Sequence, residues 1–185
     1  MPSILSRSPV SILVPLAGIL SLAAVLRLGA MRAEFWLDEI WSWEFSRAAA
    51  SPWEIVAGAE QHHDNNHKLN TLFLWLYPSG ASWQTYRLHS LAAGLASVAL
   101  AALLGLRRGR AEAIFVSLLF ATNYWLVLCS AEARGYALAV LFALAAFSTL
   151  QGYLTAVPSA GRRIQLVLFW CKIGRKCAKL PLERR

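Results

Sequence analysis

Two adjacent carboxylates, Asp38 and Glu39, stand in the tryptophan-rich stretch AEFWLDEIWSW at residues 33–43. Neighbouring side chains on a helix diverge by about 100°, so we expect one of the two to point inward while the other pairs or is solvated. A carboxylate near apolar surroundings is costly unless it is paired, which makes such a residue at a membrane edge a candidate for function. The alternative is a solvated first helical turn, where acidic residues interact favourably with the helix dipole.

A second polar cluster, HHDNNHK, follows at residues 62–68. His63 and His67 have the spacing with which two histidines on one helix face bind a metal ion, so they form a candidate metal site. The two asparagines between them favour a turn, and a polar loop at the interface needs no metal. Lys68 precedes an apolar helix, where a lipid phosphate would be found, and snorkelling of its side chain explains its position equally well.

Charged residues also flank two apolar runs further along the chain. Glu132 and Arg134 lie in SAEARGYAL, residues 130–138, in a tight turn between two such runs, and Arg87 opens another. As alternatives to a functional role, the first two residues would form a charge pair that closes a hairpin, and Arg87 would be an interfacial anchor.

The elements that position these residues are expected to be membrane helices. The chain has 185 residues, 57% hydrophobic and 15% charged, whereas soluble domains contain about 45–50% apolar and about 25% charged residues. A span needs about 20 mostly apolar residues. We predict an all-α fold, a polytopic membrane helical bundle with four spans and a broken fifth. The runs are Val10–Leu28, Leu88–Leu106, Ala113–Leu128, Tyr136–Leu154 and the short Ile164–Cys171.

The basic loops predict the orientation of the bundle. RRGR at 107–110 joins the second and third spans and GRR at 161–163 follows the fourth, so the positive-inside rule places both in the cytoplasm. The loop 29–87 and the turn 129–135 then share the extracytoplasmic face, and with them all the polar clusters. This common side favours a site. The net charge of +8 does not indicate a nucleic-acid partner, because the basic residues lie in short clusters between apolar blocks.

The outer loop is expected to contain interfacial helices. Aromatic and aliphatic residues at helical spacing predict a first helix whose indoles lie at headgroup depth; they are Trp36, Leu37, Ile40 and Trp41. In ASPWEIVAGAE, Ser51 as N-cap and Pro52 at the first position predict a second, short helix. TLFLWLY restarts an apolar helix that ends at PSGAS.

Four motifs in this order resemble the membrane-embedded GT-C glycosyltransferases of the protein O-mannosyltransferase type, including the related bacterial lipid-modifying transferases. They are the acidic pair Asp38 and Glu39, NNHKLNTLFLWL at 65–76, YRLHSLAAGL at 86–95 and SAEARGYAL at 130–138, within roughly residues 10–155. The family usually has proline where this chain has Lys68 and His89. The resemblance implies transfer of a sugar from a polyprenyl-phosphate carrier to an acceptor at the extracytoplasmic face of a bacterial plasma membrane.

The resemblance also implies roles for individual residues. Asp38 corresponds to the acidic residue of the first loop, which acts as general base on the acceptor hydroxyl or orients it, and Glu39 supports it or helps to bind the acceptor. From their common side of the membrane, Lys68, Arg87 and Arg134 are candidates to offset the charge of the leaving phosphate. His67 and Glu132 are further site candidates. Membrane lipids and a lipid-phosphate sugar are the expected partners; the acceptor, the sugar and any cofactor, a divalent metal included, are left open.

The resemblance stops near Val157. Residues 1–157 are expected to form the N-terminal part of a GT-C transmembrane domain, and residues 158–185 a basic tail unlike the family, as a frameshift or premature gene end would produce. Two other classes of protein stay open. One is a non-enzymatic membrane partner or remnant that uses the tryptophan-rich helix as an interface. The other is a metal or ion carrier, which the absence of Asp and Glu at mid-depth in the expected spans disfavours.

Overall fold

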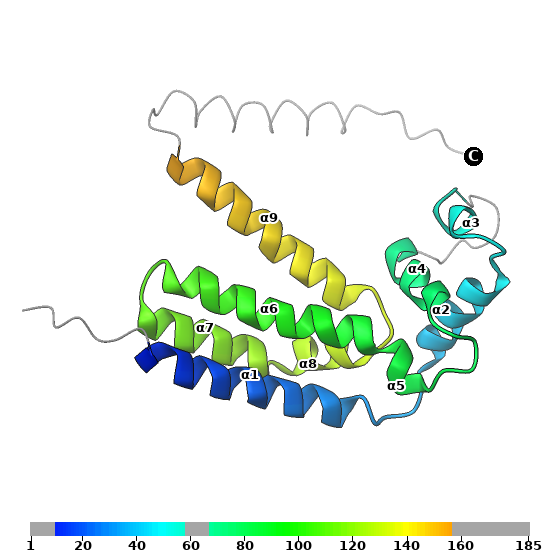
Figure 1. The fold of residues 1–185 in the computed structure, drawn as a ribbon, viewed down its shortest axis with the longest axis horizontal. Helices are drawn as coiled ribbons and strands as arrows, with labels where there is room; N and C mark the ends of the chain where they lie inside the picture. The colour runs from blue at the N-terminus through cyan, green and yellow to red at the C-terminus, as the bar shows by residue number, and fades with distance from the viewer. Residues whose placement is uncertain (1–9, 58–66, 157–185) are drawn as a thin grey trace, which may run out of the picture. The chain divides into compact units, whose positions relative to one another are not determined.

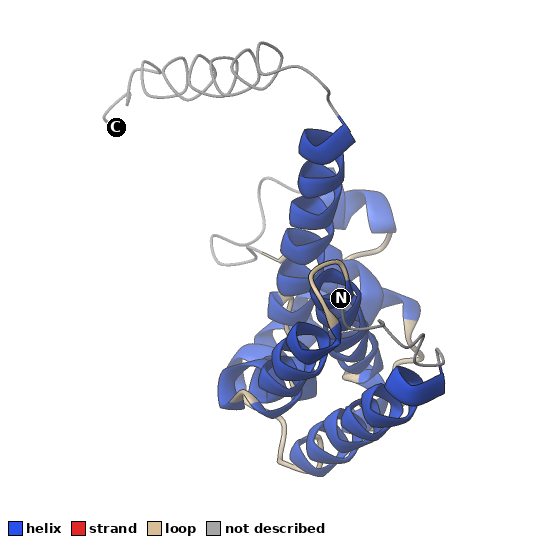
Figure 2. Cartoon of the chain, turned by 90° about the vertical axis from the view of Figure 1, so that its left-hand side faces the viewer, coloured by secondary structure: helices blue, strands red, loops and turns tan. Residues whose placement is uncertain are grey.

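The computed structural model describes residues 10–57 and 67–156, and the regular secondary structure of these residues is entirely helical (Figures 1 and 2). The helices are α1 (Val10–Ala30), α2 (Leu37–Ala48), α3 (Pro52–Ala57), α4 (Lys68–Leu76), α5 (Trp83–Tyr86), α6 (Leu88–Leu106), α7 (Arg110–Thr122), α8 (Tyr124–Ala131) and α9 (Tyr136–Ala156). The chain divides within α9 into two compact units, residues 1–145 and 146–185. The predictions for His63, for the run Ile164–Cys171 and for the tail 158–185 lie outside the described residues.

Within the described residues, three helices are long and apolar enough to cross a membrane, namely α1, α6 and α9. They coincide with three of the predicted spans, and α6 has the predicted bounds, Leu88–Leu106. The helices α7 and α8 form a fourth candidate only if they are counted together, because they are bent by 57° with respect to each other. The predicted span Ala113–Leu128 is therefore not one straight helix but is interrupted at Asn123, and the count of four spans stays a prediction. The described chain is consistent with a membrane protein of three or four spans.

The break between α7 and α8 has two physical causes. Asn123 has an extended backbone, and its side-chain oxygen accepts the N–H of Leu126 at 3.1 Å, so it caps the start of α8. The guanidinium of Arg27 in α1, which is 1% exposed, donates to the carbonyls of Phe120 and Ala121 at 3.0 and 3.1 Å. Carbonyls at a helix C-terminus lack hydrogen-bond donors within the helix, and inside the bundle Arg27 provides those donors.

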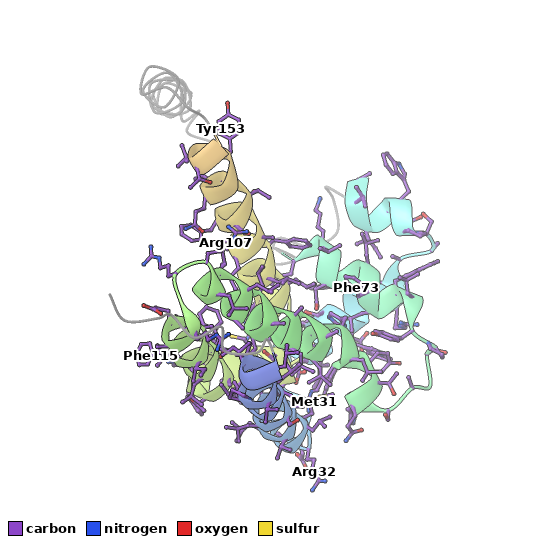
Figure 3. All side chains as sticks on the ribbon, turned by 60° about the vertical axis from the view of Figure 1, so that its left-hand side comes forward. Met31, Arg32, Phe73, Arg107, Phe115 and Tyr153 are labelled. Atoms are coloured by element: carbon purple, nitrogen blue, oxygen red, sulfur yellow. The ribbon has the colours of Figure 1, made fainter. Side chains whose placement is uncertain are left out.

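Small residues allow the helices of the bundle to approach closely. A Cβ added to Gly94 in α6 would lie 2.1 Å from Oγ of Ser130 in α8, and one added to Gly105 would lie 2.6 Å from Cα of Ala113 in α7. Such contacts are typical of helix packing in membranes. Large apolar side chains point outward instead, as Phe115 of α7 does at 63% exposed (Figure 3).

The segment between α1 and α6 folds into the short helices α2 to α5, which lie at the end of the bundle where α6 begins (Figure 1). The predicted second helix is confirmed as α3, with Oγ of Ser51 accepting the N–H of Glu54 at 3.3 Å. The indole of Trp75 in α4 donates to the carbonyl of Ala49 at 3.2 Å, and Arg47 of α2 donates to the carbonyl of Tyr77 at 3.1 Å. These bonds fix α2 against α4.

The burial pattern of α2 is the reverse of that of a helix in a soluble protein. The helix buries Glu39 completely, whereas the large apolar side chains on another face are between 40% and 61% exposed. These are Leu37, Ile40 and Trp41, together with Trp36 at the N-cap. An exposed cluster of this kind marks a surface that contacts lipid or another protein. The predicted helix is present, and its indoles are available to a membrane interface.

Candidate functional site

A buried ion pair fastens the segment between α1 and α6 to the bundle. Glu39 is 0% exposed and Arg87, at the junction of α5 and α6, is 1% exposed. Nε of Arg87 donates to Oε1 of Glu39 at 2.8 Å, and Nη2 donates to Oε2 at 2.6 Å. This two-pronged geometry is the strongest arrangement that an arginine and a carboxylate can form. Since isolated buried charges are very costly, each of these residues requires the other.

Arg87 uses its remaining donors on the backbone that leaves α1. Nη1 donates to the carbonyls of Met31 and Ala33 at 2.8 and 2.7 Å, and Nη2 donates to that of Glu34 at 2.9 Å. Together with the two bonds to Glu39, these contacts occupy all five N–H groups of the guanidinium. In this arrangement Arg87 has no donor left for a phosphate oxygen. We therefore assign Arg87 to the scaffold of the site and no longer to the predicted phosphate contact.

Glu39 also connects this scaffold to the turn between α8 and α9. Its Oε1 accepts the backbone N–H of Ala133 at 2.5 Å, and its Oε2 accepts that of Trp36 at 2.9 Å. The expectation that one of the two adjacent carboxylates points inward is thus confirmed, and the inward one is Glu39. Because Glu39 is fully enclosed, this geometry does not support its predicted contact with an acceptor.

Asp38 faces the other way and meets Arg134 from the turn. Its side chain is 50% exposed, and Oδ2 lies 2.8 Å from Nη2 of Arg134. Arg134 has two further neighbours. Its Nη1 lies 3.6 Å from Oε2 of Glu132, and its Nη2 donates to the hydroxyl of Tyr136 at 2.9 Å, with the guanidinium 4.6 Å from the centre of the tyrosine ring. One cation is therefore held among two carboxylates and a phenol.

His67 completes this group from the start of α4. Its imidazole packs edge-on against the ring of Tyr136, with 4.8 Å between the ring centres. Gly135 leaves the space for this contact, since a Cβ there would lie 2.9 Å from the imidazole. We call the five residues Asp38, His67, Glu132, Arg134 and Tyr136 the Asp38–Arg134 cluster. Besides Asp38, three of the five were predicted as site residues, His67 from one motif and Glu132 and Arg134 from another. The fold brings these four together.

Two members of the cluster have shifted proton affinities. Burial, assisted by the charge of Arg134, lowers the pKa of His67 below its ordinary value of 6.5, so the imidazole is neutral near pH 7. Burial raises the pKa of Glu132 above its ordinary 4.5, and the attraction of Arg134 works in the opposite direction. Desolvation is thus the larger effect on both groups, as it is at many functional sites.

The other predicted contacts lie elsewhere or stay predictions. Nζ of Lys68 donates to the carbonyl of Val56 at the end of α3, at 2.9 Å, and its phosphate contact stays a prediction. No group of three or more His, Cys, Asp or Glu side chains within the described residues is arranged to hold a metal ion. The metal pair of His63 and His67 stays a prediction, because His63 is outside those residues.

Neither Tyr136 nor the pairing of Glu39 with Arg87 was predicted from the sequence. Tyr136 follows Arg134 by two residues in SAEARGYAL, so its position in this motif was the available signal. For Glu39 and Arg87, the signal was the cost of leaving either charge unpaired at a membrane edge.

In comparisons with known proteins, no family model, no curated protein and no solved structure matches this chain.

Proposed function

We propose that this chain is, or forms part of, an integral membrane glycosyltransferase of the GT-C type. It transfers a sugar from a polyprenyl-phosphate carrier to an acceptor hydroxyl at the extracytoplasmic face. The observation that carries the proposal is the 2.8 Å pair between Asp38, which is half exposed, and Arg134, which comes from a distant motif of the same resemblance. The pair unites a carboxylate suited to general-base catalysis with a cation suited to a phosphate.

In the proposed reaction, the oxygen of the acceptor hydroxyl attacks the anomeric carbon of the sugar, and Asp38 accepts the proton of that hydroxyl. The bond between that carbon and the phosphate oxygen breaks, and its electron pair leaves with the phosphate. Arg134 stabilises the charge that develops there. In the structure the two side chains neutralise each other. A phosphate that binds Arg134 takes over the role of counter-ion, which releases the carboxylate of Asp38 for the acceptor.

The remaining partners in the cluster suit this reaction. Tyr136 keeps the guanidinium of Arg134 in position through a 2.9 Å hydrogen bond. His67 is neutral near pH 7 and adds no competing positive charge beside Arg134. Glu132 lies 3.6 Å from Nη1 of Arg134 and so helps to keep the guanidinium in place.

The proposed membrane arrangement has four spans, with α7 and α8 counted as one broken span. The basic turn at 107–109 lies between α6 and α7, at the opposite end of α6 from Arg87 and the cluster. The positive-inside rule then assigns the turn to the cytoplasm and the cluster to the extracytoplasmic face. The exposed indoles of Trp36 and Trp41, with Trp53 of α3 at 72% exposed, support a position of these helices in the interface.

The test is a transfer assay on the purified chain in lipid nanodiscs, with a radiolabelled polyprenyl-phosphate sugar and a bacterial lipid extract as acceptor. Asp38→Asn should reduce transfer by about a hundredfold or more. Glu112→Gln, which changes an exposed carboxylate at the start of α7, is the matched control and should retain transfer. Absence of transfer by the unchanged chain with a panel of donor sugars would refute the proposed activity and favour a non-enzymatic membrane partner.

A second experiment tests the proposed orientation. A reporter that is active only in the cytoplasm should be inactive when fused after Asp38 and active when fused within the turn 107–109. The reverse pattern would place the cluster on the wrong side for a carrier-linked sugar outside the cell.

A further inference from the structure

The turn that carries Glu132 and Arg134 is held on both sides of one residue, Ala133. Glu39 accepts the N–H of Ala133, and the side-chain amide of Asn70 in α4 donates to its carbonyl at 3.0 Å. Ala133 and Asn70 are both 0% exposed. Water cannot replace either bond at such a position, so both polar groups of this residue depend on side chains from the segment between α1 and α6.

Asn70 is itself oriented by a second buried side chain. Its Oδ1 lies 2.7 Å from Nε2 of His89, in the first turn of α6. Since the amide nitrogen of Asn70 is committed to Ala133, its oxygen is the acceptor, and the network assigns the proton of the imidazole to Nε2. The ring of His89 stacks on Phe73 with an angle of 4° and a centre distance of 5.1 Å. The imidazole therefore fixes the amide of Asn70 in the orientation that Ala133 requires.

The next residue of the turn is also held. Oγ of Ser90 in α6 donates to the carbonyl of Arg134 at 3.2 Å. The backbone of Ala133 and Arg134 is thus held by side chains of α2, α4 and α6. The side chain of Arg134 leaves this fixed backbone toward Asp38. A shift of this backbone would therefore move the guanidinium of Arg134, even though Arg134 itself is unchanged.

On the basis of the proposed function, we infer that Asn70 and His89 are positioning residues of the site. They hold the peptide of Ala133 so that Arg134 meets Asp38 at hydrogen-bonding distance. Neither side chain contacts the reacting groups. Their contribution is to geometry, to which transfer reactions are sensitive.

The experiment compares amide hydrogen exchange, measured by mass spectrometry on the full chain in nanodiscs, with transfer kinetics. Asn70→Leu removes both bonds at similar volume, and exchange at 132–136 should become at least about fivefold faster. Exchange within α1 should not change. Gln84→Leu, at an exposed amide of α5, is the matched control and should have no effect on 132–136.

His89 gives the milder variant and a rescue. His89→Leu leaves Asn70 able to reach Ala133 but no longer oriented, so the increase at 132–136 should be smaller than in Asn70→Leu. His89→Gln retains a side-chain N–H that can donate to Oδ1 of Asn70, and it should restore slower exchange. In an active chain, Asn70→Leu should lower kcat roughly tenfold to a hundredfold. The KM for the acceptor should stay within about twofold, since ground-state contacts with the acceptor are retained.

The outcomes separate this inference from the proposed function. Unchanged exchange at 132–136 in Asn70→Leu would overturn the positioning role. An equal loss of protection in every helix of both Asn70→Leu and His89→Leu would overturn it as well. Faster exchange at 132–136 without any loss of kcat in an active chain would overturn it too. Selectively faster exchange at 132–136 in a chain that transfers no sugar would support the contacts around Ala133. It would count only against the proposed glycosyltransferase activity.

Discussion

Breaking the buried pair of Glu39 and Arg87 should destabilise the protein more than any other single change to a charge in α2. Glu39→Gln retains the size of the side chain and removes its charge, which leaves the guanidinium of Arg87 buried without its counter-ion. Loss of one partner from such a pair costs about 3–5 kcal/mol. We expect the lower end for Glu39→Gln, because an amide oxygen can still accept one hydrogen bond from Arg87 and Arg87 keeps three carbonyl acceptors.

Arg87→Met should be the more damaging variant. It leaves the carboxylate of Glu39 buried with only the two backbone N–H groups of Trp36 and Ala133, and it also removes the partners of three carbonyls. We expect a loss of about 5 kcal/mol. For a chain of this length, losses of about 3–5 kcal/mol correspond to roughly 6–20 °C in Tm.

The assay is reversible unfolding in mixed micelles, followed for both single variants and for the double variant. In the double-mutant cycle the two changes should be non-additive by at least about 2 kcal/mol, since the second change removes a charge that the first has already left unpaired. Glu44→Gln, at an exposed position of the same helix, is the control and should stay within about 0.5 kcal/mol of the wild type. Additive effects, or single variants as stable as this control, would show that Glu39 and Arg87 do not form a buried ion pair.

Three further changes test other parts of the structure. The pKa of His67 is lowered in the folded protein, so the unfolded chain binds a proton at this imidazole more readily, and stability should fall as the pH drops through 6.5. His67→Gln should flatten this fall of Tm with pH. An identical fall in the variant would contradict the lowered pKa. Gly94→Ala should cost about 1–3 kcal/mol, since its Cβ would lie 2.1 Å from Oγ of Ser130, whereas Gly18→Ala, whose Cβ would meet no described atom within 4 Å, should not lower Tm. Arg27→Met should speed amide exchange in α8 by at least about fivefold by unpairing the carbonyls that end α7, and unchanged exchange would disprove this role.

The sequence alone determined the positions of the long helices. A run of apolar residues must be long enough to cover the bilayer, and polar or turn-forming residues must end it. The bounds of α6 and the start of α9 therefore follow from composition along the chain. The start of α3 follows in the same way from a local signal, Ser51 followed by Pro52. These features depend only on residues close together in the sequence.

The break at Asn123, in contrast, depends on contacts between residues far apart in the sequence. The apolar run continues through it, so composition predicted one helix, and an asparagine in such a run is compatible with either outcome. The break is stable because Arg27, more than ninety residues earlier, supplies donors to the released carbonyls. Only the packing of α1 against α7 and α8 brings those groups together.

For the site too, the sequence identified the candidate residues, and the packing of the helices determined their partners. Residue types and their order identified Asp38, His67, Glu132 and Arg134 as candidates on one side of the membrane. The rotation of α2 against α4 and α6 encloses Glu39 and leaves Asp38 exposed. As a result, Glu39 forms its ion pair with Arg87, and Asp38 forms its ion pair with Arg134. The reason is that Coulombic and hydrogen-bonding partners are chosen by distances of a few ångströms between segments far apart in the chain, and the sequence does not contain those distances until the helices have packed.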